Sequence, residues 1–155
     1  METEMYAIIA IDSNKEMTYI VCSVCEKPLH NPLSLCPSCR RNAVSATSFA
    51  SKRLFRFLIS VASDTRVFTV ICFDRAAKLL FGCSADEFFN FSQIHPFAAE
   101  NAGKMLEGEM CRMTLSKPKN GNAQHLRVAS VVPFSSGFRP VIQSLKQLYR
   151  VSDTS

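Results

Sequence analysis

The sequence of 155 residues contains no tryptophan, and its five glycines and seven prolines are neither clustered nor periodic. This composition excludes collagen-like and low-complexity chains. The longest apolar runs fall far short of the ~20 residues that a membrane-spanning helix requires. Apolar residues make up 47% of the chain and charged residues 20%, which is typical of globular proteins rather than disordered ones. We therefore expect one globular domain over residues 1–155, with no membrane partner.

The first residues, METEMYAIIAID, lack the basic start and the long apolar segment of a signal peptide. This absence predicts a cytosolic or nuclear protein. Disulfide bonds are rare in those reducing compartments, so the seven cysteines indicate metal binding or simple packing instead.

Four of the cysteines form two Cys-x-x-Cys pairs, ten residues apart: Cys22, Cys25, Cys36 and Cys39. Each pair places two sulfur atoms on one side of a metal ion, and four thiolates complete the tetrahedral shell that Zn²⁺ prefers. The spacing therefore predicts a zinc ribbon at about residues 19–42. We expect the ribbon to hold one structural Zn²⁺. Four thiolates fill its coordination shell, so no open coordination position remains for catalysis. His30 is the competing fourth ligand, and four buried cysteines without a metal are the alternative interpretation.

Charge is distributed unevenly along the chain. Residues 1–39 carry 2 basic and 5 acidic side chains, whereas residues 40–155 carry 16 basic and 8 acidic ones. The basic part follows the cysteine pairs and favours a polyanionic partner. Many soluble domains have a similar excess of basic side chains. In the alternative interpretation, these side chains are simply exposed to solvent.

Alternating apolar residues predict several short β-strands, and helical segments interrupt and follow them. The expected strands are residues 5–11, 17–22, 52–62, 66–73, 109–117 and 124–134. The expected helices are residues 74–82, a segment that begins with a capping box at Ser84 and Glu87, residues 95–108 and residues 138–150. Gly82 is the expected end of the first helix. The pattern of about five strands with helices between them predicts a small, mainly β, closed barrel of the OB type.

The C-terminal helix carries an apolar stripe at helical spacing. Its members are Phe138, Val141, Ile142, Leu145, Leu148 and Tyr149. Such a stripe has to be buried. It packs either on the chain's own barrel or on a partner subunit.

Three segments, in order around the cysteine pairs, carry a family resemblance. YAIIAIDSNKEMTYIVCSVC, FRFLISVASDTRVFTVICFDRAAKLLFG and CRMTLSK…HLRVASVVPF resemble the C-terminal DNA-binding domain of the replication protein A large subunit. The layout is also similar to the N-terminal domain of the noxin family, the DNA-damage-induced apoptosis suppressors. The resemblance implies a five-stranded OB-fold barrel with an inserted zinc ribbon. It further implies a nuclear protein that binds single-stranded DNA in replication, repair or recombination.

OB folds that bind single strands combine a basic groove with aromatic side chains on which bases stack. The predicted hairpins supply the candidates Lys52, Arg53, Arg56, Arg66, Phe68, Arg112, Lys117, Lys119 and Arg127. Strand alternation puts Arg56 toward solvent and Arg53 on the same face as Phe55. Phe68 is the predicted stacking residue, whereas Phe73 is expected in the core.

Two functions are consistent with the sequence. One is a single-stranded DNA-binding module. The alternative is an assembly module that joins other OB-fold subunits through its C-terminal helix and binds little nucleic acid itself. An enzyme is not expected, because the three histidines have no catalytic partner at motif spacing and no phosphate-binding loop is present. Cys72 and Cys111 are expected to be buried as small apolar residues.

Overall fold

The computed structural model describes residues 3–31, 36–37, 51–118 and 124–150 of the chain. The strands are β1 (Thr3–Ile11), β2 (Thr18–Cys22), β3 (Ser51–Ala62), β4 (Val67–Phe73), β5 (Met110–Ser116) and β6 (Leu126–Pro133). The helices are α1 (Asp74–Phe81), α2 (Ala85–Ile94), α3 (Ala98–Leu106) and α4 (Val141–Tyr149). All the predicted strands and helices are thus present, with small differences at their ends. None of the described helices has the length and apolar character of a membrane span.

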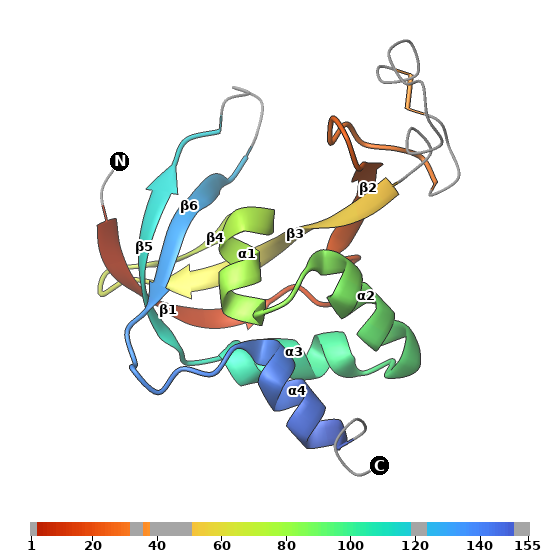
Figure 1. The fold of residues 1–155 in the computed structure, drawn as a ribbon. Coiled ribbons are helices and arrows are strands. Elements are labelled where there is room, and N and C mark those ends of the chain that lie inside the picture. The colour runs from red at the N-terminus through yellow and green to blue at the C-terminus, as the bar shows by residue number, and fades with distance from the viewer. Residues whose placement is uncertain (1–2, 32–35, 38–50, 119–123, 151–155) are drawn as a thin grey trace.

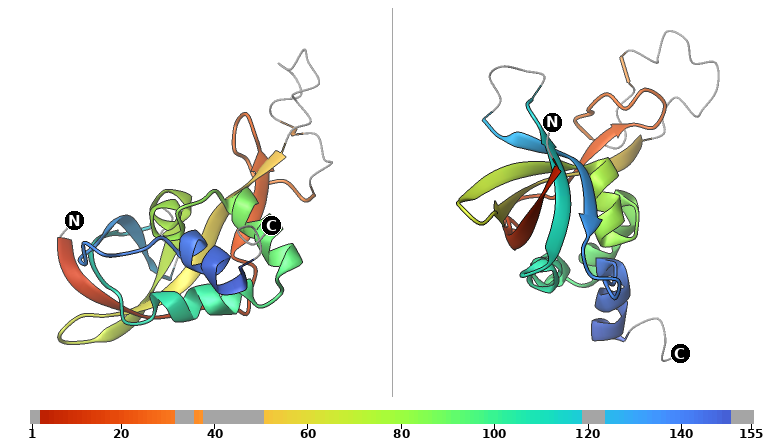
Figure 2. Two further views of the ribbon diagram at one scale, coloured as in Figure 1. Left: turned by 60° about the horizontal axis from the view of Figure 1, so that its bottom comes forward. Right: turned by 90° about the vertical axis from the view of Figure 1, so that its left-hand side faces the viewer.

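Five strands close a ring in the order β1, β5, β6, β4, β3 and back to β1 (Figure 1). Neighbouring strands are antiparallel except β4 and β6, which run parallel where Val70 lies beside Leu126. The helices α1, α2 and α3 connect β4 to β5. Helices lie along one side and at one end of the ring (Figure 2). The predicted fold class, a mainly β closed barrel of the OB type, is confirmed.

β2 is a sixth strand that lies outside the ring. It pairs with residues 51–55 of β3, whereas β1 pairs with β3 only from Ile59 onward. Residues 12–17 between β1 and β2 remain on this side of β3, since the Arg56 N–H donates to the Met17 carbonyl at 2.8 Å. We refer to β2, the turn after it up to Asn31 and residues 51–55 of β3 as the arm.

The interior of the ring is filled by alternate side chains of its strands. On β3 the buried ones are Phe55, Phe57, Ile59 and Val61. Phe55 meets Phe81 of α1 and Phe88 of α2, with ring centroids 4.9 and 5.8 Å apart. Burying one such side chain stabilises the fold by ~1.5–3 kcal/mol, so this cluster anchors the helices to the ring.

The ends of α1 and α2 follow the local signals in the sequence. Gly82 ends α1 with a φ of 71°, and the Ser84 hydroxyl accepts a hydrogen bond from the Glu87 N–H at 3.0 Å. Both predicted boundary signals are therefore confirmed. A Cβ atom at residue 82 would lie 2.3 Å from the Pro140 Cβ, so glycine also allows the start of α4 to approach α1.

α4 begins at Val141, with Pro140 as its N-cap, and not at residue 138. Its apolar stripe packs on the chain's own core, where Val141, Ile142 and Leu145 are buried and Phe138 and Tyr149 are partly buried. Leu148 is 53% exposed. Of the two expected partners of the stripe, the chain's own fold therefore takes up Val141, Ile142 and Leu145, because α4 lies against α3 and α1. Binding of a partner subunit by the rest of the stripe stays a prediction.

Candidate metal centre and nucleic-acid interface

β2 ends at Cys22 in a tight turn that carries the first cysteine pair. The Cys22 N–H donates to the Lys27 carbonyl at 2.9 Å, and the Glu26 N–H donates to the Cys22 carbonyl at 2.9 Å. Glu26 has a φ of 63°, in the left-handed region, and so reverses the chain directly after Cys25. The turn holds the two cysteines of the pair on one side of the arm.

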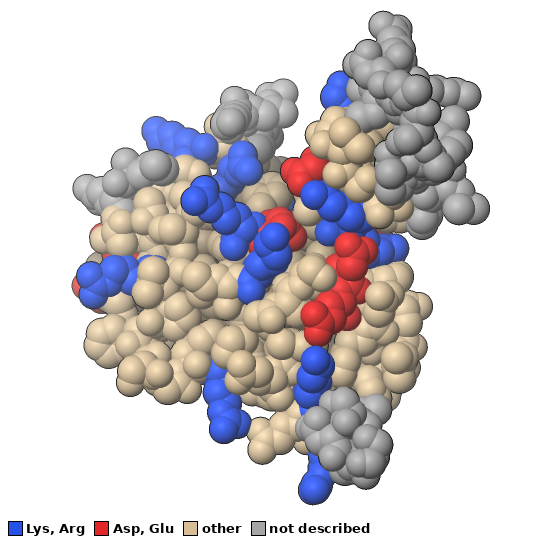
Figure 3. Space-filling view, viewed as in Figure 1, with Lys and Arg blue, Asp and Glu red and all other residues tan. Residues whose placement is uncertain are grey.

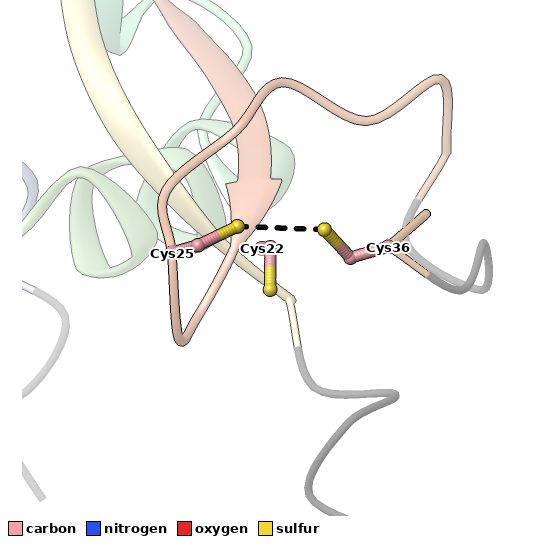
Figure 4. A group of neighbouring side chains, drawn as sticks. All are labelled: Cys22, Cys25 and Cys36. Carbon is pink, nitrogen blue, oxygen red and sulfur yellow. Dashed lines mark hydrogen bonds between the residues drawn. The ribbon is translucent and has the colours of Figure 1, made fainter. Parts of the chain in front are cut away.

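Three of the four predicted metal ligands lie together at this turn: Cys22, Cys25 and Cys36 (Figure 4). Their sulfur atoms lie within 4.8 Å of one another, and those of Cys25 and Cys36 are 3.4 Å apart. Tetrahedral Zn–S bonds of about 2.3 Å separate sulfur atoms by about 3.8 Å, so this spacing fits a zinc ion. The Val24 N–H also donates to the Cys22 sulfur at 3.4 Å, which favours a thiolate there. Cys39, the fourth predicted ligand, lies outside the described residues.

The other cysteines that the structure describes are of a different kind. Burial raises the pKa of the Cys72 and Cys83 thiols to about 12, and that of Cys111 to about 11. These thiols stay protonated at neutral pH, so they are poor nucleophiles and poor metal ligands. The prediction that Cys72 and Cys111 are buried is confirmed. His30 does not belong to the described cluster of potential ligands.

The outer face of β3 and β4 carries a row of arginine and aromatic side chains. Arg56 on β3 lies opposite Phe73 on β4, and the Arg127 guanidinium from β6 covers the Phe73 ring at 4.4 Å. The parallel pairing of β4 with β6 brings Arg127 to this place. Tyr19 of the arm pairs with Leu54, so strand alternation places it on the same face of the sheet as Arg56. We call Tyr19, Arg56, Phe73 and Arg127 the groove row.

The electrostatics of the groove row favour an anion. Burial, Asp74 and Glu26 raise the pKa of Tyr19 while Arg56 and Arg127 act in the opposite direction, so the phenol is neutral at physiological pH. Arg56 is exposed and forms no ion pair with any residue that the structure describes. Lysine and arginine side chains gather on this face, between the β5–β6 hairpin and the arm (Figure 3). Lys52 at its edge is paired with Glu26 at 2.6 Å.

Arg53 lies on the opposite face of β3 from Arg56. Its guanidinium stacks on the Phe89 ring of α2 at 3.4 Å and donates to the Thr18 hydroxyl at 2.9 Å. Alternation explains this placement, because Arg53 shares the face of the buried Phe55. The two predicted nucleic-acid-binding residues Arg53 and Arg56 thus lie on opposite faces of β3, as strand alternation predicts, and Arg53 lies outside the groove row.

Arg66 and Phe68 lie at the far end of the β3–β4 hairpin. The Arg66 guanidinium covers the Phe68 ring at 4.1 Å, and Tyr6 meets that ring edge-on at 5.8 Å. Phe68 is about 17 Å along the strand from Phe73 and packs against the core, so the predicted stacking residue lies apart from the groove row. Phe73, expected in the core, is half-buried on the outer face. The neighbouring Cys72 is the residue that points inward, and alternation counted from it would have found Phe73.

The remaining candidates surround the ring. Arg112 is exposed on the outer face of β5, opposite Val132 of β6. Lys117 is exposed directly after Ser116, which pairs with Arg127, so it borders the groove row. Lys119 lies outside the described residues. The structure thus brings Arg56 and Arg127 together, with Lys52 and Lys117 at the two edges.

No protein-family model matches the sequence, and no curated protein matches it. Two solved structures are similar in fold. Yeast RPA bound to ssDNA has 18% sequence identity and a TM-score of 0.61, over 96% of this chain and 84% of that one. A replication protein A heterotrimer bound to ssDNA has 15% identity and a TM-score of 0.58, over 96% of this chain and 35% of that one, so this chain spans about a third of its length. The chain therefore has an OB fold of the kind found in replication protein A.

Proposed function

We propose that this protein is a non-enzymatic single-stranded DNA-binding module that works in the nucleus, in DNA replication, repair or recombination. The groove row of Arg56, Phe73 and Arg127 carries this proposal. OB folds bind oligonucleotides on their second and third barrel strands, between the loops that follow the first and fourth. Here these strands are β3 and β4, flanked by the arm and by the β5–β6 connection. The fold shared with RPA bound to ssDNA supports the same function.

Each part of the groove row suits one part of a nucleotide. Phe73 holds the Arg127 guanidinium flat, and arginine planes of this kind stack on bases. Arg56 has open donors for a phosphate, and Tyr19 offers a second aromatic face. Each stacked base contributes ~1–3 kcal/mol. A few phosphate contacts add a term that weakens with salt, so we expect modest, salt-sensitive affinity.

A zinc ion is the second part of the proposal. Cys22, Cys25 and Cys36 would hold it, with Cys39 as the fourth ligand. A closed thiolate shell supplies folding free energy rather than catalysis. The ion would fix the turn at the end of β2, and thereby the position of Tyr19 on that strand.

Fluorescence anisotropy with a labelled dT oligonucleotide of about 30 nucleotides tests the proposal. We expect binding that weakens with salt, and we expect Arg56→Gln and Arg127→Ala to weaken it about tenfold or more, by the loss of a phosphate contact and of a stacking platform. Arg66→Gln is the matched control, since it removes the same charge at the far end of the hairpin. Absence of salt-dependent binding at micromolar protein, or an equal loss in the control, contradicts the proposal. A parallel titration with the matching oligo-U determines whether DNA or RNA is preferred.

A further inference from the structure

A small cavity lies on the side of the arm that faces away from the groove row. Its volume is about 180 Å³, and it is lined by residues 15–18 at the start of β2, by Arg53 of β3, by α2 and by Ala99 of α3. Its apolar floor consists of Met17, Phe88, Phe89 and Ala99. An apolar cavity of about 150 Å³ is large enough to bind benzene, so this one admits a phenyl ring.

Arg53 forms one wall of the cavity and is held in a fixed orientation. Phe89 supports one face of the guanidinium, and the hydroxyl of the buried Thr18 accepts one of its N–H groups. The remaining guanidinium N–H donors have no partner among the residues that the structure describes. A guanidinium fixed in this way is pre-organised for the two oxygens of a carboxylate.

The charges around the cavity favour a single carboxylate over a polyanion. Lys15 lies at its rim, but Glu16 lines it too. The Asp86 carboxylate accepts the Arg53 backbone N–H at 3.2 Å, and Glu87 follows it in the first turn of α2. Acidic side chains accordingly show at the start of α2 (Figure 3). These carboxylates repel a chain of phosphates more strongly than they repel one carboxylate, which the Arg53 guanidinium can pair with.

We infer that this cavity docks a segment of a partner protein in which an aromatic residue adjoins an acidic one. The aromatic ring fills the apolar cavity, and the carboxylate pairs with the Arg53 guanidinium. This site is independent of the groove row, because Arg53 and Arg56 lie on opposite faces of β3. The protein therefore holds a partner segment and a nucleic acid at the same time.

The blocked dipeptide N-acetyl-Asp-Phe-amide is the probe, titrated into the ¹⁵N-labelled, zinc-loaded full chain and followed by amide chemical shifts. We expect shifts around the cavity and saturation at millimolar concentration. N-acetyl-Asn-Phe-amide and N-acetyl-Asp-Ala-amide should each bind at least about tenfold more weakly, since one lacks the charge and the other the ring. If either control peptide binds as tightly as the probe, the inference is overturned.

Variants of the protein give a second, independent test. Arg53→Lys keeps the positive charge but cannot donate two parallel hydrogen bonds to a carboxylate. Ala99→Leu fills the cavity. Each variant should bind the dipeptide probe at least about fivefold more weakly than the native chain. Arg56→Gln is the matched control and should bind the dipeptide as the native chain does. Spectra that remain dispersed identify folded variants. Unchanged dipeptide binding by folded Ala99→Leu, or a loss of dT binding in Arg53→Lys as large as in Arg56→Gln, overturns the inference.

Discussion

The two halves of β3 are stabilised by different interactions. Residues 56–62 belong to the ring, where they pair with β4 on one side and, near their end, with β1 on the other. Residues 51–55 leave the ring for the arm and pair with β2 alone among the described strands. The ring half buries Phe57, Ile59 and Val61 in the core. The arm half buries only Phe55, where it joins the ring, and then leads to a turn whose cysteines converge.

The difference shows where this chain needs a metal. The arm is too small to bury a core of its own, and Val24 in its turn is 64% exposed. Segments of this size are stabilised by a metal or a disulfide rather than by apolar contacts. The ring, in contrast, has a continuous set of buried side chains from strands and helices. Experiments that remove the metal or the core should therefore affect the two halves separately.

Chelation should have the largest effect, and it should be confined to the arm. Structural zinc sites have apparent binding free energies of about 10–16 kcal/mol at pH 7. Loss of the zinc ion should therefore unfold the turn and β2. Hydrogen exchange is the measurement: the Cys22, Glu26 and Leu29 amides, which donate within the arm, should lose protection. Ring amides such as that of Ile59 should keep it. Retained protection of the Cys22 amide in strong chelator contradicts a metal-dependent arm.

Ile59→Ala should have the next largest effect, and it should act on the ring. The side chain is 1% exposed, and truncation at such sites costs ~2–5 kcal/mol of the free energy of unfolding. Urea denaturation measures the loss, and Leu58→Ala on the outer face is the matched control with a smaller expected loss. Zinc affinity at temperatures where the variant is folded should be unchanged. A tenfold weaker zinc affinity would show that ring and arm are coupled.

The parts of the fold that the sequence predicts are those governed by local rules. Gly82 and the Ser84 capping box mark helix ends, and alternation identifies the strands, because each depends only on near neighbours in the chain. The face of α4 was not predictable in the same way. An apolar stripe shows that Val141 and Leu145 are buried but not which surface buries them.

The candidate site was predicted in part for the same reason. The cysteine pairs are local, and three of the ligands converge as expected. The contact between Phe73 and Arg127 depends on a parallel pairing of strands that are far apart in the sequence. No local pattern indicates that pairing, although alternation counted from the buried Cys72 places Phe73 on the outer face. Strand alternation predicts that Arg53 lies on the other face of the strand from Arg56, but its contact with Phe89 of α2 depends on the tertiary fold.

Phe73→Leu tests whether the closed ring of strands binds nucleic acid independently of the arm. It removes the support beneath Arg127 and should weaken dT binding by ~1–3 kcal/mol, about 5- to 150-fold. Anisotropy measures the loss, with Phe68→Leu as the control that should reduce stability more than binding. In chelator-treated protein the unfolded arm should no longer hold Tyr19 in place, whereas Phe73 should keep its position. We therefore expect this protein to retain part of its affinity for dT. Equal losses in the two Phe variants would contradict the assignment of stacking to Phe73.

The smallest effect is expected at Lys52, where the arm borders the groove row. Glu26 accepts a hydrogen bond from this lysine at 2.6 Å, which raises the pKa of Lys52 and keeps its charge neutralised within the arm. Glu26→Gln should free Lys52 for a phosphate and steepen the slope of log K against log salt for the single-stranded oligonucleotide by about 0.7. Asp64→Asn, which removes a charge at the distant hairpin turn, is the control. Stability should change little, because exposed ion pairs contribute little. An unchanged slope would mean that the arm positions Tyr19 for the nucleic acid but adds no charge of its own.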